Sequence, residues 1–384
     1  MVAFHETQAR TNAMSIDTAR LRLATTPGIG PALALRLIER FGSADKALAA
    51  GEAGWRDSGI PAAPRRALAE PGPTFTATQA WLDEPGHYFI GLDDRIYPTV
   101  LAELDPPPAW LYGLGDMDLL SYPAIAIVGS RNPSHAGRDA AYEFGRALAN
   151  AGLVVVSGLA RGIDAAAHEG ALAADGMTIA VTGTGLDRVY PAANKHLAER
   201  IAKHGLLISE FGLGTQPARG NFPRRNRVIA GLCTATLVVE AARASGSLIT
   251  ARMASAANRD VFALPGSTHN PLARGCHQLI REGAKLVETT DHILEEIAGS
   301  IGGYRRTSGV EAFDKDSTEA TDPEANHDTQ SNALLEAIGH DPVRVDELVA
   351  RIGWPADAVS STLLILELEG RIQTVAGGAY VRTG

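Results

Sequence analysis

The chain has 384 residues, of which 45% are hydrophobic and 21% charged, so it is long enough for two or three domains with sizeable cores. It contains no run of about 18 apolar residues, and we therefore expect no membrane span. Its two cysteines, Cys233 and Cys276, lie far apart and form no CxxC pattern. That argues against a disulfide framework and a structural zinc site, and it favours a cytosolic location.

The formal net charge of −9 at pH 7 hides a segregation of charge along the chain. Residues 311–328 contain seven acids and one base, a net of −6. Residues 211–282 contain nine arginines and three acids, a net of +6. Because the local distribution of charge decides electrostatic contacts, the arginine-rich segment is a candidate for binding a polyanion.

The N-terminal part is predicted to be helical. Residues 1–14 lack the apolar stretch of a secretory signal and are expected to form a flexible extension, with Met14 as an alternative start. Residues 15–85 form the first predicted domain. Its phrase Pro-Gly-Ile-Gly-Pro at 27–31 resembles a helix-hairpin-helix, in which backbone N–H groups bind phosphate. The alternative is a small bundle that only packs, and the near balance of charge in this domain favours it.

Residues 86–298 alternate short apolar runs with amphipathic segments. The runs are continuous stretches of Ile, Val, Leu and Ala, which are typical of parallel strands buried on both faces. We therefore predict an α/β fold, a doubly wound Rossmann-like parallel sheet. Strands are expected at 124–128, 153–156, 178–181, 206–208, 235–239, 261–264 and 285–287, with helices that include 136–151, 163–174 and 197–204.

The C-terminal part begins with residues 299–330, an acidic stretch whose composition predicts a disordered linker. In residues 331–384 the pattern predicts a winged helix, with a hairpin turn at Gly377-Gly378. The third predicted helix, 356–368, holds two acids and no base, and the domain carries −3. A sequence-specific transcription factor would need a basic helix there. We expect this domain to contact protein or to tune access to the arginine-rich segment.

In a doubly wound sheet, ligands bind outside the carboxyl ends of the strands, and glycine-containing polar phrases follow these strands here. Glycine lets a phosphate reach backbone N–H groups, while hydroxyls and a helix N-terminus add further donors. The expected DNA-binding donors of this kind are Gly129, Ser130, Ser157, Gly158, Ser245, Gly246, Ser247 and Thr250. The expected cations are Arg131, Arg224, Arg225 and Arg227, accompanied by Asn226 and by Phe222 as the aromatic that stacks on a base.

Several other residues invite a catalytic interpretation. Asp164 and His168 lie four residues apart, but no second carboxylate or nucleophile accompanies them, so capping and packing are favoured. Glu210 and Glu240 end two strands, where they either orient the arginines or do chemistry. The phrase Gly183-Thr184-Gly185 lacks the third glycine of GxGxxG, and no GxxxxGK[ST] occurs, which excludes a P-loop.

These motifs together resemble DNA-processing protein A, the DprA/Smf family. The resemblance is carried by residues 127–131, 157–164 with His168, Tyr190-Pro191, 222–227, 239–241, 245–247 and Pro265-Gly266. It implies a cytosolic protein that binds single-stranded DNA as a homodimer in natural transformation and loads a RecA-type recombinase. It implies neither catalysis nor a cofactor. The family's binding residues map onto Gly129, Ser130, Arg131, Lys195, Phe222 and Arg224 to Arg227, with Arg219 as a further candidate.

The main alternative is a Rossmann-like nucleotide-processing enzyme similar to nucleoside-monophosphate phosphoribohydrolases. Those relatives carry a PGGxGT phrase with a carboxylate downstream. Here the phrase Pro265-Gly266-Ser267-Thr268 lacks the second glycine and the acid. Because no base, nucleophile and oxyanion donor converge in the motifs, we predict that the chain is not an enzyme.

Overall fold

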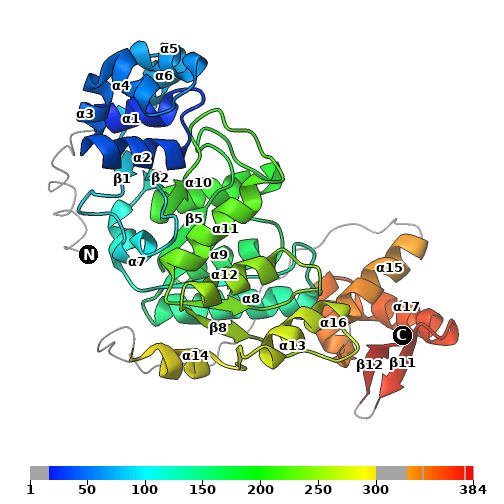
Figure 1. Ribbon diagram of the computed structural model, residues 1–384. Helices are drawn as coiled ribbons and strands as arrows, with labels where there is room; N and C mark the ends of the chain where they lie inside the picture. Colours follow the sequence, from blue (N-terminus) through cyan, green and yellow to red (C-terminus); the bar gives the residue numbers. More distant parts are fainter. Residues whose placement is uncertain (1–16, 300–326, 340, 376–377, 384) are drawn as a thin grey trace, which may run out of the picture. The chain divides into compact units, whose positions relative to one another are not determined.

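The computed structural model describes residues 17–299, 327–339, 341–375 and 378–383, with side chains of 327–330 excepted (Figure 1). The predicted N-terminal extension, the acids of 311–324 and Gly377 lie outside the described residues. Two compact units emerge from the contacts. Unit 1 comprises the described residues up to Tyr122 together with Ile179–Leu232, and unit 2 comprises those of Pro123–Thr178 and of the chain from Cys233 onward.

Unit 1 begins with a group of short helices. α1 and α2 flank the hairpin at 26–30, and Pro31 starts α2 at a position whose N–H needs no partner. Gly28 has φ +84°, and a Cβ there would lie 2.6 Å from Cγ of Pro64, so the hairpin requires glycine. The helices are α1 (Thr18–Thr25), α2 (Pro31–Phe41), α3 (Ala44–Ala49), α4 (Gly51–Asp57), α5 (Ala62–Ala69) and α6 (Pro73–Leu82).

These helices share a core with two strands that the sequence did not indicate, β1 (His87–Gly91) and β2 (Trp110–Gly115). Leu21, Leu37 and Trp55 of the helices pack in one cluster with Trp110 and Tyr112 of β2. Both strands carry aromatics and glycines rather than a continuous aliphatic run, which explains why the pattern missed them. The helices and this strand pair therefore form one core.

The strand order in unit 1 is β1-β2-β6-β5. β5 (Thr178–Val181) and β6 (Leu206–Ser209) are parallel, as predicted. However, β1 pairs with β2, and β2 with β6, in antiparallel register. The predicted parallel sheet is therefore mostly parallel, with antiparallel strands at this side. α7 (Thr99–Ala102), α10 (Lys195–His204) and α11 (Asn221–Leu232) complete this unit.

Unit 2 contains a fully parallel set of strands in the order β4-β3-β7-β8-β9. Because β4 and β7 lie on opposite sides of β3, the strand order reverses at β3, which makes its carboxyl end a topological switch point. The strands are β3 (Ala124–Val128), β4 (Val154–Ser157), β7 (Ala235–Val238), β8 (Asp260–Ala263) and β9 (Lys285–Leu286). The doubly wound α/β prediction is confirmed.

The helices of unit 2 bury the aliphatic faces of these strands. Ile125, Val155 and Leu237 pack in one cluster with Phe144 and Ile163 of the first two helices. A Cβ at Gly145 would lie 2.4 Å from the carbonyl oxygen of Ala167, so these two helices are in close contact. The helices are α8 (His135–Asn150), α9 (Ile163–Ala173), α12 (Ser247–Ala256), α13 (Arg274–Arg281) and α14 (Thr290–Ile297).

The C-terminal part has the predicted winged-helix order around its own core of residues such as Leu334, Leu348, Leu363 and Leu366. α15 begins at His327, inside the stretch 299–330 that was predicted to be a linker. The elements are α15 (His327–Ile338), β10 (Val343–Arg344), α16 (Val345–Ile352), α17 (Ala356–Leu368), β11 (Ile372–Val375) and β12 (Ala379–Arg382). Among the described residues, no helix is long and apolar enough to cross a membrane.

Candidate nucleic-acid interface

An aromatic pair lies at the start of α11 in unit 1. The ring of Phe222 is 5.7 Å from that of Tyr190, centroid to centroid, and their planes are inclined by 37°. Tyr190 is 46% exposed. Gly183 lies beneath Phe222, because a Cβ there would be only 3.2 Å from the ring. The sequence identified Phe222 but not Tyr190, whose only signal was its place in the Tyr190-Pro191 motif.

The three arginines of α11 occupy three different environments. At 100° per residue, Arg225 points away from Arg224 and Arg227, and these two have different neighbours. Arg224 is exposed, and its guanidinium lies 5.2 Å from the centroid of the Phe211 ring. Arg225 is buried and donates from Nη1 to the carbonyl oxygen of Val181 at 2.6 Å. Arg227 is half-buried and forms an ion pair with Glu210. Of the three, only Arg224 is presented fully to solvent.

Two further predicted cations of unit 1 are exposed. Arg219 lies in the loop just before α11, and Lys195 begins α10, with its Nζ 3.9 Å from a carboxylate oxygen of Glu199. Asn226 is half-buried, and its Oδ1 accepts from Nε of Arg225 at 3.0 Å. The exposed cations of the predicted set in unit 1 are thus Lys195, Arg219 and Arg224.

Glu210 follows β6 and is the acid of this region. It accepts from Arg227, and so agrees with the first of the two alternatives, that it orients a neighbouring arginine. Burial raises the pKa of the Glu210 carboxyl, while the positive charges of Arg227 and Arg224 act in the opposite direction. Arg227 also donates to the carbonyl oxygen of Pro106 at 2.5 Å, so the pair holds the segments after β6 and before β2 together.

In unit 2 the switch point at the end of β3 carries the Gly129-Ser130-Arg131 phrase. A Cβ at Gly129 would lie 2.7 Å from Cγ1 of Ile163, so the backbone approaches α9 closely here. The Ser130 N–H donates to the carbonyl oxygen of Glu240 at 2.7 Å, which joins the loops after β3 and β7. Arg131 is exposed. The structure therefore places this cation at the edge where a doubly wound fold binds ligands.

The predicted donors at the end of β4 are used within the fold. Ser157 is fully buried, and its hydroxyl donates to the carbonyl oxygen of Ile127 at 2.6 Å. The Gly158 N–H donates to Oδ2 of Asp164 at 3.1 Å. The sequence pattern identified the right residue types but not the direction of these donors, which is set by the neighbouring strand and helix.

The phrase Ser245-Gly246-Ser247 spans the start of α12: Gly246 is the N-cap and Ser247 is the first residue of the helix. Gly246 is exposed, with open space where a Cβ would stand, while the Ser245 and Ser247 hydroxyls are hydrogen-bonded to each other at 2.6 Å. Thr250, one turn into the helix, is buried. The exposed backbone at a helix N-terminus suits an anion.

The residues with catalytic potential in unit 2 have structural partners. Asp164 accepts from two backbone N–H groups, and Nδ1 of His168 lies 2.7 Å from Oγ1 of Thr178. Glu240 accepts from the N–H and hydroxyl of Ser134 at 2.9 and 2.6 Å, and thereby stabilises the start of α8. That role of Glu240 was not predicted. Within the described residues, no three His, Cys, Asp or Glu side chains come together in a way that could hold a metal ion.

In chain order, the protein joins an N-terminal group of helices, a Rossmann-like α/β fold and a C-terminal winged helix. This combination is shared with a class of DNA-processing proteins. The family model of DNA recombination-mediator protein A matches residues 88–298. Models of a DprA-like N-terminal HHH domain and of a DprA winged helix domain match residues 15–68 and 318–378. The chain belongs to the DNA recombination-mediator protein A family, known as DprA or Smf.

Individual relatives agree with this assignment. Protein Smf of Escherichia coli is 39% identical over 319 residues, which cover 83% of each chain. The X-ray structure of DNA processing protein A from Streptococcus pneumoniae has a TM-score of 0.59 at 36% identity, covering 74% of this chain and 99% of that one. A structure from Helicobacter pylori, described as giving the single-stranded DNA binding mode of that protein, has a TM-score of 0.51 at 31% identity, covering 55% and 96%.

Proposed function

We propose that this chain binds single-stranded DNA, does no chemistry on it, and acts as a recombination mediator. The observation that carries the proposal is the aromatic pair Tyr190–Phe222, which shares its segment of unit 1 with the exposed cations Arg219 and Arg224. A base stacks on an aromatic ring, while arginines neutralise the neighbouring phosphates. The single-stranded DNA described for the Helicobacter pylori relative supports the same ligand here.

The aromatic pair also explains a preference for single strands. In a duplex both faces of each base are covered by its neighbours, so an aromatic ring can stack only on a base that has left the stack. α11 itself is poorly suited to reading a major groove, because it begins with Asn221 and Phe222 and has only Arg224 fully exposed among its arginines.

Unit 2 supplies a second set of contacts in this proposal. Arg131, the hydroxyl of Ser130 and the backbone of Gly129 receive one phosphate at the switch point, and the N-terminus of α12 at Gly246 receives another. Ser157, Gly158, Arg225, Arg227 and Thr250 instead support the fold around these contacts. The proposed direct contacts are Gly129, Ser130, Arg131, Tyr190, Lys195, Arg219, Phe222, Arg224, Ser245 and Gly246.

The proposal that no reaction is catalysed rests on the use of the polar groups. Asp164, His168 and Glu240 each bond to backbone or hydroxyl groups of the fold. The alternative, a nucleotide-processing enzyme, is tested by incubating the protein with nucleoside monophosphates and measuring free base. Release of base that co-purifies with the chain and is lost in Asp164→Asn would contradict the proposal.

The mediator role includes two finer elements that follow from the family resemblance. We infer that the chain works in the cytosol as a homodimer and loads a RecA-type recombinase onto the strand. The description of the matching family as a recombination mediator supports this role. Sedimentation tests the dimer. Loading is tested by strand exchange with a RecA-type recombinase on DNA already coated by a single-strand-binding protein. The reaction is compared with and without this chain.

The decisive experiment for DNA binding is fluorescence anisotropy with a labelled oligonucleotide, single-stranded or as a blunt duplex, across a salt series. We expect tighter binding of the single strand and a linear fall of log K with log salt, because phosphate contacts release counterions. The double variant Arg219→Ala, Arg224→Ala should weaken binding and flatten the salt slope. Arg281→Ala, an exposed arginine at the end of α13, is the matched control. Equal or tighter binding of the duplex would contradict the proposal.

A further inference from the structure

The third helix of the winged helix, α17, carries apolar residues on two opposite faces. Val359, Leu363 and Leu366 point inward and are fully buried. Leu364, Ile365 and Leu368 are 59%, 37% and 80% exposed, and we call these three residues the outer stripe. At 100° per residue, Leu364 and Leu368 lie 40° apart and roughly opposite Leu366. A helix that is apolar all round is typical of one buried on both sides.

The polar residues near the outer stripe do little to hydrate it. The hydroxyls of Ser360 and Ser361 donate back to the carbonyl oxygens of Ala356 and Asp357, at 2.7 and 2.8 Å. Their protons are thus used within the helix. Three large aliphatic side chains on one helix face form an exposed apolar surface of the kind that marks an interaction site.

The charges around the outer stripe are acidic. Asp357 begins the same face of α17, and Glu367 lies beside Leu368, where it also accepts from the N–H and hydroxyl of Thr374. α17 contains no Lys or Arg. From Ser331 onward the domain has seven acids against four arginines.

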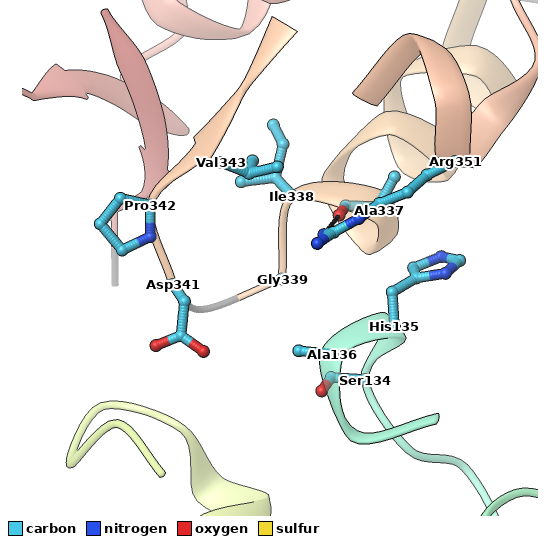
Figure 2. Close-up of a pocket in the computed structure, with 10 residues that line it drawn as sticks. All are labelled: Ser134, His135, Ala136, Ala337, Ile338, Gly339, Asp341, Pro342, Val343 and Arg351. Atoms are coloured by element: carbon cyan, nitrogen blue, oxygen red, sulfur yellow. Dashed lines mark hydrogen bonds between the residues drawn. The ribbon is translucent and has the colours of Figure 1, made fainter. Parts of the chain in front are cut away.

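Two of those arginines are engaged within the domain. Arg351 donates to the carbonyl oxygen of Ala337 at 3.0 Å (Figure 2). It also lies 3.7 Å from Glu347. Arg371 lies 3.4 Å from Glu369 and donates to Asn332 at 3.1 Å. The electrostatic surface that borders the outer stripe therefore attracts cations and repels phosphate.

We propose that the outer stripe docks a helix of a partner protein, one with apolar residues at i, i+3, i+4 and i+7 flanked by Lys or Arg. The apolar residues would cover Leu364, Ile365 and Leu368, while the cations would face Asp357 and Glu367. A second copy of α17 is disfavoured because it would bring the same acids against these. DNA is disfavoured because the helix that winged helices place in the major groove has no cation here. This protein-docking surface is separate from the proposed DNA contacts.

The test uses the full chain and two labelled helical peptides with the same Leu positions, one with flanking Lys and one with flanking Glu. Fluorescence anisotropy should show the Lys peptide binding at least about tenfold more tightly than the Glu peptide, which is about 1.4 kcal/mol. Added salt should reduce the difference. Equal binding of the two peptides, or binding of neither, would overturn the proposal.

Variants then locate the binding surface. The double variant Leu364→Ser, Leu368→Ser should weaken binding of the Lys peptide at least about tenfold, whereas Leu286→Ser, a 48% exposed leucine of β9, should leave it unchanged. If thermal melting shows the double variant to be unfolded, Leu368→Ser alone gives the same comparison. Unchanged peptide binding in a folded variant overturns the proposal. Loss of dimer formation or of duplex binding in the double variant would also overturn the proposal, because the outer stripe would then contact a second copy or DNA.

Discussion

Neighbouring side chains of the same type have different roles in this protein, and the arginines of α11 are the clearest case. Arg224 is exposed, whereas Arg225 is buried and donates to the carbonyl oxygen of Val181. Arg227 forms an ion pair with Glu210. In the sequence the three form one basic run. Only the packing of α11 against β5 and β6 separates a candidate DNA contact from two structural residues.

Replacing Arg225 should therefore affect folding more than replacing Arg224. We expect Arg225→Ala to lower the free energy of unfolding by about 1–3 kcal/mol, because the buried carbonyl of Val181 loses its donor. Arg224→Ala, at an exposed position, should change it by less than about 0.5 kcal/mol. Urea denaturation followed by circular dichroism measures both. Equal stability of the two variants would show that the buried bond of Arg225 contributes nothing.

Because Tyr190 and Phe222 form one aromatic pair, we expect them to contribute similarly to the free energy of DNA binding. Phe222→Ala and Tyr190→Ala should each weaken binding of a single strand by about 1–3 kcal/mol, the usual range for losing one stacked base. Anisotropy titration is the measurement, and Tyr122→Ala, a 49% exposed tyrosine before β3, is the control. If Tyr190→Ala binds like the wild type, the base stacks on Phe222 alone.

At the scale of elements, the closest helix contact in unit 2 depends on glycine. A Cβ at Gly145 of α8 would lie 2.4 Å from the carbonyl oxygen of Ala167, and one at Gly170 of α9 only 2.0 Å from that of Tyr142. Both helices also pack on β4. Separating them would shift α9, which begins beside the Gly129-Ser130 turn at the switch point.

Gly145→Ala should consequently destabilise the fold, although alanine is the better helix former by up to about 1 kcal/mol. Overpacking of this kind costs about 1–3 kcal/mol, and we expect that cost to exceed the gain in helix propensity. Gly220→Ala is the control, because no atom lies within 4 Å of the added Cβ. Thermal unfolding of both variants is the measurement. A melting temperature for Gly145→Ala at or above that of the wild type would contradict the contact.

The success of sequence reasoning differed among elements for a physical reason. The β3 and β5 strands were predicted to the residue because buried parallel strands leave continuous aliphatic runs. β1 and β2 were missed because aromatics and glycines interrupt their pattern. Their place in the fold depends on the pairing of β2 with β6 and on the core that both strands share with the N-terminal helices, which are long-range contacts.

For the whole molecule, charge segregation predicts that the C-terminal part is not needed for DNA binding. A chain ending at Gly299 lacks the acidic stretch and the winged helix, and it should bind a single strand as tightly as the full chain or slightly more tightly. Anisotropy titration of both chains at equal salt measures this. A loss of tenfold or more, about 1.4 kcal/mol, would mean that the winged helix contacts DNA directly.

The sequence by itself determined the α/β class, the winged-helix order of the C-terminal part and the family, because aliphatic periodicity, charge runs and glycine-containing motifs are local features of the chain. Tertiary structure decided which candidate side chains reach solvent. It turned the Ser157 hydroxyl toward β3, paired Tyr190 with Phe222, and left Leu364 and Leu368 of α17 exposed. Each outcome depends on a neighbour from a distant segment, and a one-dimensional pattern does not contain that neighbour.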